Sequence, residues 1–372
     1  MNTSCEGRVK IALLPKYHRD GSSSRLRFYQ YAETDPFSEF SIDVFPLYGK
    51  RYIHDLYARG KRCKFGVAGA YLRRFFLLGK LLRYDVVWLE KEFFPRLPAT
   101  AEWVLSRLGM RYIVDYDDAT FHDYDLSPNR VYRTLMRRKI DRVMSYSRAV
   151  ICGNAYIQER ANASGAPDTC VVPTVVDLGK YLLPENDNAV LTVGWIGTPP
   201  TEKYLEIVKR PVSKLLEKVS GRLLLVGVSE RAREHFEGVS LTIKPWEEAR
   251  ETEYISQMDI GIMPLKDEPW ERGKCGFKLL QYMAAGKPVV ASPVGVNSDI
   301  VEGSGCGYLA RTEEDWFNGL YRLARDAELR KILGAQGRKA VEQRYSLESQ
   351  AERLAEIIAR HSRPVKTVGP GG

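Results

Sequence analysis

The 372-residue chain has few cysteines and histidines and no long apolar run. Its six cysteines form no Cys-x-x-Cys pair and no cysteine–histidine spacing typical of a metal site. No uncharged apolar stretch approaches the roughly 20 residues that a membrane-spanning helix needs. The first residues, MNTSCEGRVKIALL, lack the basic start, long apolar core and cleavage site of a signal peptide. We therefore expect a reduced, cytoplasmic protein with no metal ion and no cofactor.

The chain is long enough for two domains, and it carries a formal net charge of +9. An excess of positive charge favours a polyanionic partner, such as nucleic acid, an anionic membrane surface or a phosphorylated substrate. The basic residues flank amphipathic stretches, and the sequence contains no RNA- or DNA-binding module. We therefore expect no nucleic-acid partner.

Short apolar runs alternate with longer helical stretches along nearly the whole chain, which indicates parallel strands covered by helices on both faces. The first series of strands is expected at 9–14, 41–45, 85–89, 112–116, 149–152 and 170–172. The second series is expected at 190–196, 222–226, 240–243, 259–264, 288–291 and 307–310. The pattern predicts an α/β protein with two doubly wound domains in tandem.

A polar break, LPENDN at 183–188, separates the two series of strands. We expect domains at 1–182 and 183–345, each with the Rossmann-like α/β architecture. Residues 346–364 are expected to form a helix that packs back toward the first domain, and 365–372 a disordered tail.

The most informative segment is KCGFKLLQYMAAGKPVVASPVG at 274–295. It predicts a helix that begins near Gly276 and ends at the stop signal Gly286, followed by a strand. Lys274 and Lys278 lie at the helix start, where free backbone N–H groups add partial positive charge. This combination suits a diphosphate group. The alternative is a packed helix–strand pair whose lysines are only solvated.

This segment resembles the donor-binding signature of the family-four retaining glycosyltransferases, which have the GT-B fold. Further stretches of the second half are similar to the same family, and SSRLRFYQY at 23–31 resembles the opening loop of one of its subgroups. The stretches in the second half are VVPTVVDLGKY at 171–181, GWIGTPPTEKYL at 194–205, DIGIMPL at 259–265 and RYSLESQAERL at 344–354.

The resemblance implies a nucleotide-sugar donor in the second domain and an acceptor in the first. It places Thr198, Lys203, Lys274 and Lys278 at the donor diphosphate, with Thr201 as a further contact. It also implies that the nucleoside lies near Trp246 and Gln281, with the amide of Gln281 bonded to a ribose hydroxyl.

The sequence departs from the family at four positions. The two signature glutamates fall at Gly273 and Gln281, so Glu271, two residues before the first, is our candidate for a substitute that contacts the donor sugar. Trp195 replaces a basic residue of the phosphate loop. A family histidine near the donor sugar falls close to Asp117.

Asp115, Asp117 and Asp118 form an acidic cluster at the end of an expected strand. We expect Asp117 and Asp118 to contact acceptor or sugar hydroxyls as catalytic residues. One alternative is a divalent metal site that grips the diphosphate, and another is turn capping by Asp118.

A Gly/Ser-rich segment follows the first expected strand. Gly21 and Ser22 are expected in a flexible loop that opens a helix, and Arg25 is the candidate that grips an anion on the acceptor side. The alternative is an ordinary capped helix with solvated arginines.

Residues 50–83 combine many lysines and arginines with aromatic side chains, and YLRRFFLLGKLL at 71–82 predicts a basic amphipathic helix. Such helices bind anionic membrane surfaces. A core helix with solvated basic edges is the alternative. RVYRTLMRRKIDR at 130–142 predicts a second basic helix in the same domain.

Together these features predict a hexosyltransferase that uses a UDP- or GDP-sugar and acts on a glycan or lipid-linked acceptor. The resemblance implies retention and independence of metal ions, and a role in polysaccharide or lipopolysaccharide synthesis. The expected location is the inner face of the cytoplasmic membrane. A sugar-nucleotide epimerase on the same scaffold and a non-catalytic membrane-surface binder remain alternatives.

Overall fold

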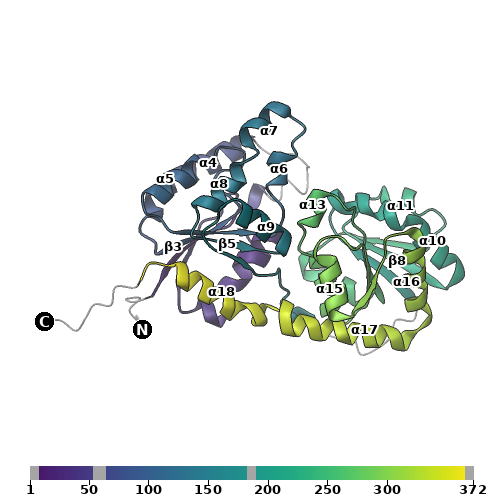
Figure 1. Ribbon diagram of the computed structural model, residues 1–372. Helices are drawn as coiled ribbons and strands as arrows, with labels where there is room; N and C mark the ends of the chain where they lie inside the picture. The colour runs from purple at the N-terminus through teal and green to yellow at the C-terminus, as the bar shows by residue number, and fades with distance from the viewer. Residues whose placement is uncertain (1–7, 53–63, 182–189, 365–372) are drawn as a thin grey trace. The chain divides into compact units, whose positions relative to one another are not determined.

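The computed structural model describes residues 8–52, 64–181 and 190–364 (Figure 1). The chain divides into two compact units, one made of Met1–Thr174 with Gln350–Gly372 and the other of Val175–Ser349. The domain boundary expected at 182/183 and the tail expected at 365–372 lie outside the described residues, as does part of the basic segment 50–83.

The first unit contains a six-stranded parallel sheet with the order β2-β1-β3-β4-β5-β6. Each strand lies within one residue of its expected range, so the sequence prediction of this sheet is confirmed. The strands are β1 (Lys10–Leu14), β2 (Ser41–Val44), β3 (Val86–Glu90), β4 (Tyr112–Tyr116), β5 (Ala149–Cys152) and β6 (Thr169–Val171).

Helices cover both faces of this sheet, and Figure 1 shows α4, α5 and α8 on the side opposite α18. One face packs against α4 (Lys64–Leu81), α5 (Thr100–Arg107), α8 (Lys139–Tyr146) and α9 (Ala155–Ala163). The helical turns after β1 are α1 (Ser22–Ser24), η1 (Arg25–Tyr29), α2 (Gln30–Ala32) and η2 (Asp35–Phe37). The last described helix is α18 (Leu347–His361). Phe28 and Phe37 lie against Trp88 of β3, with ring centroids 4.7 and 5.7 Å apart.

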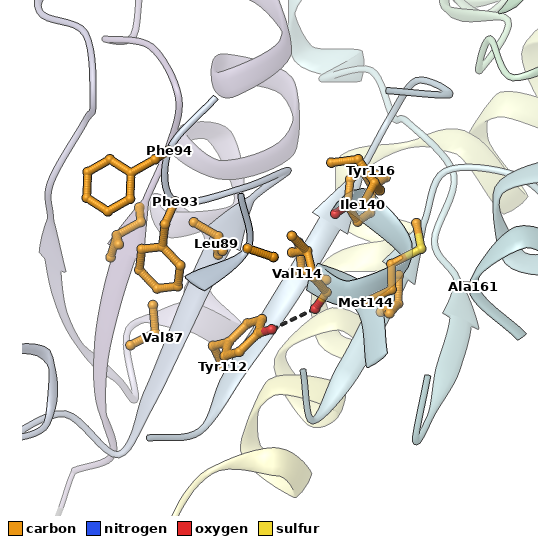
Figure 2. Packing of buried hydrophobic residues seen from close by; sticks show 14 of the residues in the cluster. Val87, Leu89, Phe93, Phe94, Tyr112, Val114, Tyr116, Ile140, Met144 and Ala161 are labelled. Carbon is orange, nitrogen blue, oxygen red and sulfur yellow. Dashed lines mark hydrogen bonds between the residues drawn. The ribbon is translucent and has the colours of Figure 1, made fainter. Parts of the chain in front are cut away.

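Figure 2 shows the core beneath α8 and α9, where alternate residues of adjacent strands, such as Val87 and Val114, point to the same side. The Tyr112 hydroxyl donates to the Val143 carbonyl at 2.6 Å and so satisfies a polar atom in this apolar layer. Strands buried on both faces need continuous apolar sequence, which is why they could be predicted.

The basic stretch 130–142 is not one helix. It forms α7 (Arg130–Met136) and the start of α8, with a break at Arg137 and Arg138, and α6 (His122–Asp125) precedes it. Lys139 follows the break and is buried, because its ammonium bonds the Glu92 carboxylate and the Phe94 carbonyl. These contacts of Lys139 change the direction of the backbone between α7 and α8, so the prediction of a single helix is wrong.

The second unit contains another six-stranded parallel sheet, with the order β12-β11-β10-β7-β8-β9. Its strands also lie within one residue of the expected ranges. They are β7 (Leu191–Ile196), β8 (Gly221–Val226), β9 (Leu241–Lys244), β10 (Ile260–Met263), β11 (Val289–Ala291) and β12 (Gly307–Leu309).

Helices cover both faces of the second sheet as well. One layer contains η4 (Pro199–Val208), α10 (Lys209–Lys218), α11 (Ala232–His235) and α16 (Glu313–Arg325). The other contains α12 (Glu251–Ser256), α14 (Phe277–Ala284), α15 (Val296–Ser304) and η6 (Val341–Tyr345), with α17 (Ala327–Ala340) packed on α14. The remaining turns are η3 (Leu178–Lys180), η5 (Glu248–Arg250) and α13 (Pro269–Arg272).

Each sheet has one point at which the strand order reverses. In the first unit the chain runs from β1 to β2 and then returns to place β3 on the other side of β1. In the second unit the chain runs from β7 to β8 and β9 and then returns, so that β10 pairs with the edge of β7 opposite β8. Ligands of open α/β sheets bind beyond the carboxyl ends of the strands at such points, so the loops there are the candidate sites. None of the described helices is both long and apolar enough to cross a membrane.

Candidate functional site

In the second unit, the loop after β7 is held in a tight turn by glycine. A Cβ on Gly197 would lie 2.2 Å from the Trp195 ring and 2.8 Å from Thr201 Oγ1, so the position has no space for a side chain. Thr198 and Thr201 close the turn, because the Thr198 N–H donates to Thr201 Oγ1 at 3.2 Å and that hydroxyl donates to the Thr198 carbonyl at 2.9 Å. Hydrogen bonds of its backbone therefore position Thr198, and the residue is exposed to solvent.

The start of α14 lies at the same edge of the sheet. Gly276 caps this helix in the left-handed conformation, with φ +67°, and a Cβ there would lie 2.6 Å from Ile300 Cδ1. Both constraints require glycine. The first N–H groups of a helix lack partners within the helix and carry partial positive charge. The helix begins near Gly276, as the sequence predicts.

Lys278 connects this helix start to the loop after β7. Its Nζ lies 3.5 Å from Thr201 Oγ1 and 4.3 Å from the centroid of the Trp195 ring. Burial lowers the pKa of Lys278 to about 7, and the nearby charge of Lys274 adds to the effect. In the described part of the chain no carboxylate pairs with Lys278. A cation that lacks a counter-ion in a partly dry site is poised to bind an anion.

Lys203 and Glu271 meet on the side of η4 that faces α13. Lys203 Nζ lies 3.9 Å from Glu271 Oε1, and the Tyr204 hydroxyl donates to the same oxygen. Glu271 is only 2% exposed, and its Oε2 has no partner among the described residues. A buried carboxylate oxygen without a partner is costly, so Glu271 Oε2 is a candidate acceptor for a ligand hydroxyl. Gly273 ends α13 and offers no side chain.

Trp246 and Gln281, the two expected nucleoside contacts, lie at the ends of one chain of polar contacts. The Trp246 indole N–H donates to Glu251 Oε2 at 2.9 Å. The Tyr181 hydroxyl lies 3.4 Å from Glu251 Oε1, and Gln281 Nε2 lies 3.4 Å from the Tyr181 oxygen. Gln281 is buried, and Trp246 is half-buried. The sequence analysis missed Tyr181 and Glu251, although Tyr181 ends a stretch that resembles the family.

In the first unit, the segment after β1 is helical from Ser22 onward. Ser22–Ser24 already forms a helical turn, and Gly21 precedes it because a Cβ there would lie 2.6 Å from Tyr17 Cβ. Ser23 Oγ lies 2.8 Å from Glu90 Oε1, and Ser24 Oγ bonds the other oxygen of the same carboxylate. Ser22 therefore lies in the first turn of the helix and not in the loop before it, whereas Gly21 directly precedes the helix as expected.

The arginines of this segment are buried. Arg27 Nε donates to Asp115 Oδ1 at 2.8 Å, and Arg27 Nη1 donates to the Val172 carbonyl at 2.8 Å. Burial raises the pKa of Asp115 to about 6 even though Arg27 opposes this shift. Arg25, the expected anion contact, is also buried, while Ser22 is exposed.

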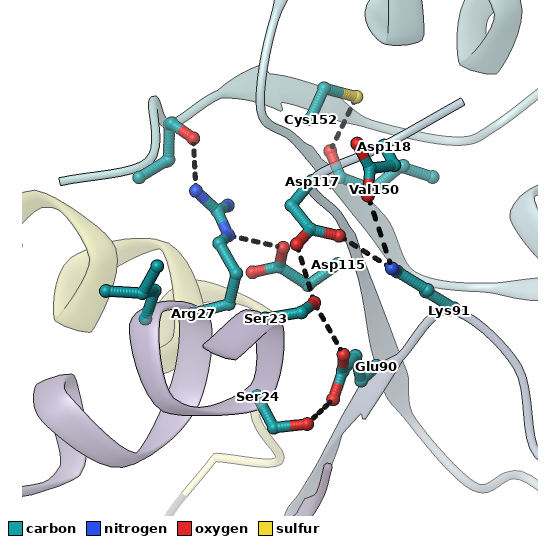
Figure 3. Close-up of polar contacts among 12 residues, drawn as sticks. Ser23, Ser24, Arg27, Glu90, Lys91, Asp115, Asp117, Asp118, Val150 and Cys152 are labelled. Carbon is teal, nitrogen blue, oxygen red and sulfur yellow. Dashed lines mark hydrogen bonds and ion pairs between the residues drawn. The ribbon is translucent and has the colours of Figure 1, made fainter. Parts of the chain in front are cut away.

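Lys91 occupies the loop after β3 in a left-handed conformation, with φ +63°. Its Nζ lies 2.8 Å from Asp117 Oδ1 and 3.9 Å from Asp118 Oδ2, as Figure 3 shows. Burial alone would raise the pKa of Asp117, but the Lys91 ammonium and the Ser23 hydroxyl, 2.6 Å from Asp117 Oδ2, lower it to about 2. Asp117 is therefore ionised and held in one orientation beside the more exposed Asp118.

Sequence reasoning missed Lys91 and Glu90. Their signal is the run of charged residues, EKE at 90–92, directly after a buried strand. A non-glycine residue with positive φ costs about 1–3 kcal/mol and is concentrated at functional sites. Backbone strain and a buried ion pair at the reversal point of the sheet thus mark Lys91 as part of the candidate site.

The acidic cluster of the first unit is paired with cations. The described residues contain no group of three or more His, Cys, Asp or Glu side chains arranged to hold a metal ion. Asp115 bonds Arg27 and Asp117 bonds Lys91. His122 bridges helices, with Nδ1 2.7 Å from Asp125 Oδ1 and Nε2 2.9 Å from the Tyr156 hydroxyl.

Comparisons with known proteins agree with this fold. The family model described as "Glycosyl transferases group 1" matches residues 187–326, the part of the chain that contains Thr198, Lys203, Glu271, Lys278 and Gln281. No curated protein matches the sequence.

Several solved structures share the architecture at low sequence identity. Sucrose-phosphate synthase from Thermosynechococcus elongatus is 17% identical with a TM-score of 0.72, covering 95% of this chain and 99% of its own. HepE from Anabaena in complex with UDP is 14% identical with a TM-score of 0.66, covering 95% and 100%. WaaG, a glycosyltransferase involved in lipopolysaccharide biosynthesis, is 13% identical with a TM-score of 0.66, covering 94% and 99%. The chain thus has the fold of the GT-B glycosyltransferases, and residues 187–326 of its second unit are similar to the group 1 glycosyltransferases.

Proposed function

We propose that the protein transfers a hexosyl group from a UDP- or GDP-sugar to a glycan or lipid-linked acceptor, with retention and without a metal ion. The observation that carries the proposal is the cation site of the second unit. Lys278 lies at the start of α14 beside Thr201, without a carboxylate partner in the described residues, inside the segment that matches the glycosyltransferase family. A diphosphate supplies the charge that this site lacks.

The second unit offers the other contacts that a nucleotide-sugar needs. We assign the nucleoside to Trp246 and Gln281, the diphosphate to Lys274, Lys278 and the loop after β7, and a hydroxyl of the donor sugar to Glu271 Oε2. Glu271 then replaces the carboxylate that is absent at Gly273. Support for a uridine nucleotide comes from HepE, whose structure contains UDP.

The reaction needs no protein base under this proposal. The acceptor oxygen attacks C1 of the donor sugar, the bond from C1 to the diphosphate oxygen breaks, and the acceptor proton passes to the departing diphosphate. Lys278 and the first N–H groups of α14 stabilise the negative charge that develops there. Asp117, with a pKa of about 2, is too weak a base to take this proton. We therefore assign Asp117 and Asp118 to orienting the acceptor hydroxyls, with Lys91 keeping Asp117 ionised.

A thermal-shift panel of UDP-, GDP-, ADP- and dTDP-sugars, with and without EDTA, tests this function. A ligand at about 100 times its Kd adds about 2.7 kcal/mol, or roughly 5–10 °C in Tm for a unit of this size. We expect such a shift with one nucleotide class, unchanged by EDTA and absent in Lys278→Ala. Lys339→Ala, which changes an exposed lysine of α17 in the same unit, is the control that keeps the shift.

Other outcomes of the panel identify the alternatives. An EDTA-sensitive shift would contradict metal independence and restore the acidic cluster as a metal site. No shift with any nucleotide would favour the non-catalytic binder. A shift accompanied by conversion of the donor sugar without any acceptor would identify the epimerase.

We also propose that the first unit binds the inner face of the cytoplasmic membrane, where polysaccharide or lipopolysaccharide precursors are built. Helix α4 exposes Leu72, Phe75 and Phe76 to solvent by 58%, 61% and 74%. Contiguous apolar side chains at the surface mark interaction sites, and the exposed Arg73, Lys80 and Arg83 attract anionic lipid. The remaining part of the segment 50–83 includes residues outside the described ranges.

The membrane proposal predicts that Phe75→Ser/Phe76→Ser lowers the fraction of protein that sediments with phospholipid vesicles by at least tenfold. Burying one such ring in the interface contributes about 1.5–3 kcal/mol, so losing two exceeds this threshold. Ile332→Ser, which removes an apolar side chain that is 47% exposed on the second unit, is the matched control. Equal sedimentation of the double variant and the wild type would refute the role of α4.

A further inference from the structure

The first unit has a pocket of about 300 Å³ outside the site described above, between α6, α8 and α9. It lies on the layer of helices that packs on one face of the sheet. Its polar lining consists of three arginines with two aspartates and a serine, namely Arg137, Arg138, Arg160, Asp125, Asp141 and Ser164.

The two aspartates of this pocket share one guanidinium group. Arg160 Nη1 lies 3.1 Å from Asp125 Oδ2, and Arg160 Nε lies 2.6 Å from Asp141 Oδ1. Asp125 also accepts a bond from His122, and the Arg160 guanidinium lies 4.9 Å from the centroid of the Phe121 ring. This network holds Arg160 in place, and the whole pocket contains three guanidinium groups against two carboxylates.

Arg137 and Arg138 supply the positive charge that could bind an anion in this pocket. They occupy the break between α7 and α8, so consecutive guanidinium groups reach the same pocket. Both residues are exposed, and neither forms an ion pair within the described residues. The pocket therefore has two guanidinium groups without an ion-pair partner among the described residues, and arginine binds phosphate through paired N–H groups.

Exposed apolar side chains lie close in sequence to the residues that line the pocket. Leu126 follows Asp125 and is 50% exposed, while Val131 and Leu135 of α7 are 71% and 73% exposed. Val131 and Leu135 lie one helical turn apart and so share a face. A soluble phosphate needs only the arginines, whereas a lipid phosphate combines an anionic headgroup with an adjacent apolar chain. The pairing of charge and apolar surface matches the lipid.

We propose that Arg137 and Arg138 bind the phosphate of an anionic phospholipid headgroup, with Leu126, Val131 and Leu135 against its acyl chains. This inference rests on the proposed membrane location and adds headgroup selectivity to it. Helix α4 supplies apolar contact that any phospholipid accepts, whereas the arginine pocket distinguishes an anionic headgroup from a zwitterionic one.

Vesicle sedimentation of the full chain tests the pocket, using phosphatidylcholine alone or mixed with phosphatidylglycerol. Each basic residue near an anionic surface contributes on the order of 1 kcal/mol. We expect Arg137→Ser/Arg138→Ser to weaken binding to the mixed vesicles about 30-fold. Binding to phosphatidylcholine alone stays at the wild-type value. The control Arg107→Ser/Arg148→Ser removes the same charge from exposed positions outside the pocket and changes binding less than threefold.

Three results would overturn the proposal. An equal loss in both double variants would show that overall charge attracts the vesicles and that the pocket has no specific role. A loss that is the same for both vesicle compositions would remove the headgroup selectivity. Protection of the wild type, but not of Arg137→Ser/Arg138→Ser, by inorganic phosphate in a thermal melt, without any difference on vesicles, would assign the pocket to a soluble phosphate. The nucleotide-sugar shift, measured in every variant, separates these failures from failure of the glycosyltransferase function.

Discussion

Binding of a nucleoside diphosphate is expected to weaken about 50-fold between pH 7 and pH 9, because Lys278 loses its charge over this range. Burial, with the added charge of Lys274, lowers the pKa of Lys278 to about 7 in the ligand-free protein. A bound diphosphate favours the ammonium form and raises this pKa. The affinity is therefore greatest below pH 7 and falls as pH rises toward the pKa of the bound state. The second ionisation of a terminal phosphate, near pH 6, is complete over this range and does not contribute.

Isothermal titration with UDP and GDP across pH 6–9 measures this dependence. Lys278→Arg keeps a permanent charge at the same position, so its affinity should be nearly independent of pH. Lys274→Gln removes the second cause of the low pKa, so the fall in affinity should move to higher pH. The same slope in Lys278→Arg as in the wild type would show that another group binds the diphosphate.

The fold was predictable because its signals are local. A strand buried on both faces is apolar at nearly every position, and this pattern predicted the first and last residues of 112–116 and 149–152. Asp115 is the exception in 112–116, and it is buried in an ion pair with Arg27. The start of helix α14 was predictable for a related reason. A glycine stop and a helix start fall within a single segment, so the place of Gly276 required no knowledge of the tertiary structure. The assignment of Lys274 and Lys278 to the diphosphate stays a prediction.

What could not be predicted depends on contacts between distant parts of the chain. The break at Arg137 and Arg138 contains neither glycine nor proline, and it exists because Lys139 is anchored at Glu92. Ser23 and Ser24 are ordered because Glu90, more than sixty residues later, accepts their hydroxyls. Such partners are known only once the order of the strands is known.

Lys91 could not be predicted either, because its partner Asp117 comes from a different strand end. Among the residues of the first unit, replacement of Lys91 is expected to cause the largest loss of transfer activity. Lys91→Gly removes the ammonium next to Asp117 and also relieves the left-handed backbone at φ +63°. Without this partner, burial raises the pKa of Asp117, so the carboxylate loses charge and its fixed orientation. Misplacing a group that orients a reacting hydroxyl costs about 100-fold, and we expect kcat/KM for the acceptor to fall by this factor.

A matched variant separates this effect from relief of backbone strain. Arg96 also has a left-handed backbone, with φ +65°, but its side chain is exposed. Arg96→Gly should therefore leave transfer activity unchanged, and thermal melts of both variants report any loss of folding. The pH profile is decisive, because Asp117 with a pKa of about 2 stays ionised above pH 5 in the wild type. Lys91→Gly should lose further activity as pH falls, and Lys91→Arg should restore the flat profile. A uniform loss at every pH would make Lys91 a purely structural residue.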